Sequence, residues 1–95
     1  MHPGRWTFLS NHGHVLVCLA RDPEARLRDV AEEVGITERA VQQIVRDLVE
    51  EHYLEKEKVG RRNRYRVVRS SHFRHQLEEG LTVGAFLDLV VGPGR

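Results

Sequence analysis

One segment, residues 27–51, restricts the possible folds of this chain more than any other. Small or apolar residues occupy the positions where two short crossing helices must touch each other and the core: Leu27, Val30, Ala31, Val34, Gly35, Ile36, Val41 and Ile44. Ala31 provides the small side chain that a close helix crossing requires, and Gly35 tolerates the left-handed backbone of a tight turn. Thr37 offers a hydroxyl N-cap for the second helix. The pattern therefore predicts a helix-turn-helix.

The second of these helices has one apolar and one polar face. Its apolar stripe follows helical spacing and must face the core: Val41, Ile44, Val45 and Leu48. The polar face and the N-terminal end carry the residues that we predict to read base edges: Thr37, Glu38, Arg39, Gln42, Gln43 and Arg46. Arginine pairs bidentately with guanine and glutamine with adenine, so this face suits the major groove of DNA. Any solvated helix can show the same pattern, so the following residues must decide between the two interpretations.

Positive charge is concentrated directly after this helix. The chain has 15 Lys and Arg against 14 Asp and Glu, a net charge of +1. Seven of the basic residues lie between Lys56 and Arg69, where Glu57 is the one acid, so the rest of the chain is net negative. A local excess of this size indicates a polyanionic partner such as double-stranded DNA.

The basic segment also has the pattern of a β-hairpin over about residues 53–68. We expect an extended segment to about Lys58, a turn over 59–63 that uses Gly60 and Asn63, and a return strand to about 68. Its predicted phosphate-binding residues are Lys58, Arg61, Arg62, Asn63 and Arg64. An edge hairpin kept soluble by charge is the alternative, but mixed signs would serve that purpose better.

The run GITERAVQQIVRDLVEEHYLEKEKVGRRNRYRV, with the preceding RLRDVAEEVG, resembles small prokaryotic winged-helix transcription regulators of the MarR-like and ArsR-like kind. The resemblance implies a homodimeric, sequence-specific DNA-binding regulator with the base-reading and hairpin residues named above. It covers most of the chain from the first helix to the hairpin, or wing. MarR-like proteins have longer helical flanks that frame a ligand pocket, and we predict no particular small-molecule effector here.

A short C-terminal helix is expected over about residues 82–91, with Thr82 as its cap. Its apolar stripe consists of Val83, Phe86, Leu87 and Val90. Such a stripe must be buried against its own domain or a symmetry mate, and we predict that these four residues form a homodimer interface. A twofold pair would place two recognition helices about 34 Å apart, to match a palindromic operator.

The whole chain, residues 1–95, is therefore predicted as a single domain of the mainly helical α+β class. Its expected parts are a three-helix winged helix-turn-helix core, with the first helix running from Ser10 or Asn11 to about Arg21, a β-hairpin wing and a short C-terminal helix. No run approaches the roughly 20 apolar residues that span a bilayer, so we expect a cytoplasmic protein without membrane contact.

Other function classes receive less support from the sequence. His72 and His75 could share a metal ion on a helix, but no further ligand completes a site, so we predict no metal, and a metal-responsive regulator is a lesser alternative. The acids occur as adjacent pairs that diverge on helices, and no nucleophile has a base partner, so we predict neither an enzyme nor a cofactor. The main alternative is a winged helix that binds another protein, which would need an exposed apolar patch on the recognition helix or wing.

Overall fold

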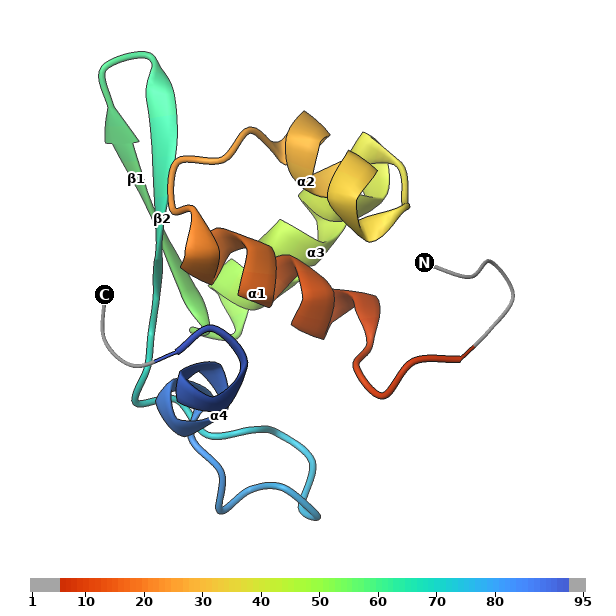
Figure 1. The fold of residues 1–95 in the computed structure, drawn as a ribbon. Helices are drawn as coiled ribbons and strands as arrows, with labels where there is room; N and C mark the ends of the chain where they lie inside the picture. The colour runs from red at the N-terminus through yellow and green to blue at the C-terminus, as the bar shows by residue number, and fades with distance from the viewer. Residues whose placement is uncertain (1–5, 93–95) are drawn as a thin grey trace.

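The computed structural model describes residues 6–92, which form four helices and one two-stranded antiparallel hairpin (Figure 1). In chain order the elements are α1 (Asn11–Arg21), α2 (Leu27–Val34), α3 (Glu38–Glu50), β1 (Leu54–Val59), β2 (Arg62–Val67) and α4 (Val83–Val90). Figure 1 shows α1, α2 and α3 grouped together, with the hairpin rising along one side of them and α4 at the base. The predicted fold class is confirmed: a mainly helical α+β winged helix-turn-helix with a short C-terminal helix. Within residues 6–92, no helix is long and apolar enough to cross a membrane.

The helix ends follow caps that the sequence encodes. Ser10 Oγ accepts a hydrogen bond of 3.3 Å from an amide in the first turn of α1. Thr37 Oγ1 accepts one of 3.0 Å from the amide of Ala40 at the start of α3. Gly35 ends α2 with φ of 87°, and its amide donates to the carbonyl of Ala31 at 2.8 Å. The left-handed Gly35 thereby turns the chain from α2 into α3 within a few residues.

The core lies where α1, α2, α3 and the base of the hairpin meet. All four residues of the predicted α3 stripe are buried, and Leu19 of α1 is fully buried. The core residues are Val15, Leu16, Leu19, Val30, Ala31, Val34, Val41, Ile44, Val45, Leu48, Tyr53, Leu54, Tyr65, Val83 and Leu87. Because the stripe of α3 faces this core, the opposite face of α3 is directed to solvent.

The wing, β1 and β2, has a tighter turn than the sequence predicted. Val59 pairs with Arg62, so the turn consists of Gly60 and Arg61 alone, and Gly60 has φ of 65°. A two-residue turn with glycine in its first central position matches the twist of the strands, which can then continue to the tip. The predicted turn over 59–63 was therefore too long, and Asn63 belongs to strand β2 opposite Lys58.

The predicted dimerisation stripe of α4 is largely used within its own domain. Val83 and Leu87 are 1% and 2% exposed and belong to the core, so neither is available to a partner subunit. Phe86 is half-buried and packs edge-to-face on Phe73 at 5.4 Å between ring centroids. Of the four predicted residues, Val90 alone is exposed. This corrects the expectation for Val83 and Leu87, and its physical reason is that α4 packs against α1 and is hydrogen-bonded to the segment that follows β2.

Candidate nucleic-acid interface

The solvent-facing side of α3 and the end of α3 nearest Gly35 present the predicted base-reading residues. All six are exposed: Thr37, Glu38, Arg39, Gln42, Gln43 and Arg46. The Thr37 hydroxyl oxygen already accepts the capping hydrogen bond, so one of its two lone pairs is used, while its hydroxyl proton and the second lone pair are left for a partner. The arginines and glutamines keep donors and acceptors for base edges, and the helix carries no exposed large apolar residue on this side.

The five predicted wing residues are also exposed, but they do not share one face of the hairpin. Lys58 and Asn63 are cross-strand partners, and the strand alternation places them on the face that continues from the buried Leu54 and Tyr65. Arg62 and Arg64 lie on the opposite face, and Arg61 lies in the turn. The hairpin therefore presents positive charge on both faces and at its tip.

Several wing arginines already have partners within the domain. Arg64 Nη2 lies 2.9 Å from Glu24 Oε2, in the connection between α1 and α2, and Arg62 Nη2 donates to the Glu24 carbonyl oxygen at 3.2 Å. Arg66 pairs with Glu55 across the strands, and Arg69 pairs with Asp88 of α4 at 2.6 Å. The basic excess counted in the sequence is thus partly neutralised in the fold.

The hydrogen bond and the charge of Arg64 lower the pKa of Glu24 from its usual value, and Glu24 raises the pKa of Arg64 in return. Both side chains are about half exposed. An ion pair in this position is weak and screened by salt, so a phosphate can compete with Glu24 for the guanidinium. The pair therefore reduces the charge of the wing without removing Arg64 from the surface.

Sequence reasoning did not identify the connection between α1 and α2 as part of this surface. The Tyr65 amide donates to the Pro23 carbonyl oxygen at 2.9 Å, which attaches this connection to the edge of β2. It thereby brings Glu24 beside Arg62 and Arg64. Nothing in the local sequence indicates this contact, because about forty residues separate the partners.

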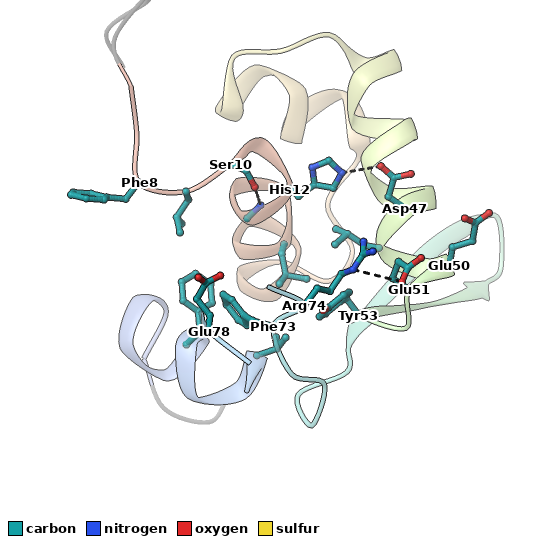
Figure 2. Close-up of a pocket in the computed structure, with 16 residues that line it drawn as sticks. Phe8, Ser10, His12, Asp47, Glu50, Glu51, Tyr53, Phe73, Arg74 and Glu78 are labelled. Atoms are coloured by element: carbon teal, nitrogen blue, oxygen red, sulfur yellow. Dashed lines mark hydrogen bonds and ion pairs between the residues drawn. The ribbon is translucent and has the colours of Figure 1, made fainter. Parts of the chain in front are cut away.

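Two further residues that the sequence did not predict, Asp47 of α3 and His12 of α1, adjoin the predicted base-reading residues. Asp47 of α3 accepts a hydrogen bond from Gln43 at 3.0 Å, and its other oxygen lies 2.8 Å from His12 Nε2 of α1 (Figure 2). Gln43 in turn accepts a hydrogen bond from Arg46 at 2.9 Å. Hydrogen bonds from His12 and from Gln43 lower the pKa of Asp47, so this carboxylate is ionised at neutral pH. The helical spacing of Asp47 and Gln43 was readable from the sequence, but the contact with His12 was not.

A separate cavity of about 580 Å³ lies between α1, the C-terminal end of α3 and α4 (Figure 2). Its walls include Leu16, Leu48, Tyr53, Phe73 and Phe86. The carboxylates at its rim are those of Asp47, Glu50, Glu51 and Glu78. Acids around its opening disfavour a phosphate backbone inside the cavity, so the cavity itself is a poorer candidate for DNA contact than the wing.

The histidines do not form a metal site among the described residues. His72 and His75 lie in the irregular segment between β2 and α4, where helical spacing does not apply. His72 Nδ1 contacts the carbonyl oxygen of Glu79 at 2.7 Å, and His75 lies 3.8 Å from Glu78. In residues 6–92, no group of three His, Cys, Asp or Glu side chains is arranged to hold an ion.

Comparison with known proteins agrees with this geometry. Residues 10–55 match a family model described as winged helix-turn-helix DNA-binding. The chain is also similar to a solved structure of the zinc-dependent MarR family transcriptional regulator AdcR in its Zn(II)-bound state, with a TM-score of 0.50 and 21% sequence identity. That match covers 72% of this chain and 49% of the regulator, so the chain spans about half of its length, and at this identity the likeness concerns the fold. No curated protein matches the chain.

Proposed function

We propose that this protein, whose residues 10–55 match a family model described as winged helix-turn-helix DNA-binding, is a sequence-specific regulator of transcription that binds double-stranded DNA. The solvent-facing side of α3 lies in the major groove, and the wing tip lies on the adjacent phosphate backbone or in the minor groove. The observation that carries the proposal is that α3 exposes arginines and glutamines while the neighbouring wing exposes cations. The proposal assigns no catalytic step to any residue.

The two groups of residues have different roles in this proposal. Arg39, Gln42, Gln43 and Arg46 contact base edges, with Thr37 and Glu38 at the end of α3 that enters the groove first. Lys58, Arg61, Arg62, Asn63 and Arg64 contact sugar and phosphate, which adds affinity but little sequence information. Arg61 in the turn and Lys58 are the strongest candidates for phosphate contact, because within residues 6–92 neither forms an ion pair with an acid.

Selection of bound sequences from a random duplex pool tests this function directly. We expect an enriched motif for the wild type. Gln42→Ala and Arg46→Ala should change the motif at individual base pairs, at about 1–3 kcal/mol for each bidentate pairing that the substitution removes. Arg61→Ala should weaken binding to all duplexes without changing the motif. Absence of any binding at low salt would contradict the function and favour a protein-binding winged helix.

We further propose that the protein binds a palindromic operator as a homodimer. With Val83 and Leu87 in the core, the outer side of α4 still offers an apolar surface to a partner, since Leu89 is 87% exposed and Val90 is 50% exposed. Analytical ultracentrifugation at micromolar concentration should show a dimer that Leu89→Lys dissociates. Leu77→Lys, at a similarly exposed leucine outside α4, is the matched control. A monomer at every concentration would contradict the dimer and leave DNA binding untouched.

A further inference from the structure

On the basis of the proposed function, we infer that Asp47, held by His12 of α1, is a positioning residue that sets which base pairs Gln43 and Arg46 read. Asp47 itself contacts no DNA in this scheme. The inference depends on a continuous chain of hydrogen bonds that runs from α1 across α3: His12 to Asp47, Asp47 to Gln43, and Gln43 to Arg46.

The chemistry of the carboxylate fixes the orientation of the Gln43 amide. An ionised carboxylate only accepts hydrogen bonds, so the NH₂ end of Gln43 must face Asp47 Oδ1, at 3.0 Å. The carbonyl end then faces Arg46, whose Nη2 donates to it at 2.9 Å. Without Asp47 the NH₂ end of Gln43 loses its acceptor, and the amide is held at its oxygen alone.

The fixed amide keeps the groups that base reading needs. One N–H and one oxygen lone pair of Gln43 remain unused, and adenine N7 and N6 require one donor and one acceptor. The Arg46 guanidinium has five N–H groups and uses one on Gln43. Ordering both side chains before binding removes part of the entropy cost that two flexible side chains would otherwise incur on the DNA.

His12 connects this arrangement to the body of the domain. It lies in the first turn of α1, and its Nε2 is 2.8 Å from Asp47 Oδ2, so both carboxylate oxygens are engaged (Figure 2). Asp47 therefore links α3 to α1, and its contact with His12 limits its response to rotamer changes of Gln43. The side chains of His12 and Asp47 are 49% and 42% exposed, so replacing either one leaves the core intact.

The test compares how strongly each variant discriminates between base pairs, expressed as a ratio of affinities, rather than its overall affinity for DNA. For each variant, affinity is measured for the duplex that the wild type selects and for duplexes with one base pair of that site exchanged. Asp47→Ala should lower the discrimination at one or two base pairs by about fivefold or more, the lower end of what a bidentate contact supplies. It should also raise affinity for unrelated duplexes, because a negative charge leaves the helix. His12→Ala should lower discrimination at the same base pairs.

Two control variants separate the effect of the Gln43–Asp47 hydrogen bond from the effect of removing the negative charge of Asp47. Asp47→Asn also removes the charge but keeps an acceptor for Gln43, so discrimination should stay within about twofold of the wild type. Glu50→Ala removes an exposed acid from the same helix and should leave discrimination unchanged. Equal losses in Asp47→Ala and Asp47→Asn, or a loss in Glu50→Ala, would overturn the inference.

A measurement without DNA completes the test. In the free protein, the side-chain amide resonances of Gln43 should shift in Asp47→Ala and stay near their wild-type positions in Glu50→Ala. If the wild type selects no sequence, the proposed function fails. If the wild type is selective and Asp47→Ala is equally selective, this inference alone fails.

Discussion

The salt dependence of DNA binding should identify the wing tip as a phosphate contact. Arg61 lies in the two-residue turn. The next residue, Arg62, donates a 3.2 Å hydrogen bond to the backbone carbonyl oxygen of Glu24. Each phosphate contact adds about 0.9 to the slope of log affinity against log salt, so Arg61→Ala with Arg62→Ala should flatten the slope by about 1.8. Between 50 and 200 mM salt, a slope difference of about 1.8 shrinks the wild-type advantage about twelvefold.

Fluorescence anisotropy of a labelled duplex at several salt concentrations measures both slopes. Arg74→Ala is the matched control, because Arg74 is an exposed arginine in the segment between β2 and α4, outside the wing, where its Nε lies 3.9 Å from Glu51 Oε1. Its slope should equal that of the wild type. Parallel lines for the wild type and the double variant would refute the placement of the wing tip on the backbone. A flattened slope in Arg74→Ala would refute the choice of the wing as the contact surface.

Three further outcomes are expected. Glu24→Gln should raise DNA affinity and steepen the salt slope by up to about 0.9, because Arg64 loses the carboxylate that pairs with it. Arg64 lowers the pKa of Glu24, so Glu24 is ionised and the pair is formed at neutral pH; an unchanged slope would mean that Arg64 faces away from DNA. His52→Gly should stabilise the domain by about 0.5–1 kcal/mol in urea unfolding, because His52 has φ of 66°, and a loss of stability would contradict this. Leu19→Ala should cost about 2–5 kcal/mol in the same assay, as Leu19 is fully buried, and a cost below about 1 kcal/mol would contradict its place in the core.

The elements that the sequence predicted well are those that local chemistry decides. Ala31 is buried in α2, Gly35 makes the turn between α2 and α3, and Thr37 caps α3, as predicted. The apolar stripe of α3 is buried, as its helical spacing required. Each of these features depends on residues within one or two helical turns of one another. Periodicity and capping rules describe such short distances directly.

The features that the sequence did not predict depend on contacts between distant segments. The α4 stripe showed that Val83 and Leu87 must be buried, but periodicity cannot tell a domain's own core from a partner subunit. Likewise, the basic count of the wing took no account of Glu24, which reaches Arg64 only because the α1–α2 connection is attached to β2. Composition gives the charge of a segment, whereas its pairing is a property of the fold.

Ion pairs within the domain determine which cations of the wing are immediately available to DNA. Arg64 and Arg66 stand opposite acids, so their guanidiniums are oriented before DNA arrives, and a phosphate must displace a carboxylate to reach them. Lys58 and Arg61 require no such exchange within the described residues. Arg61 and Lys58 should therefore contribute most of the affinity that the wing provides. The paired arginines should contribute most at low salt, where the gain from releasing counterions outweighs the loss of a weak exposed ion pair.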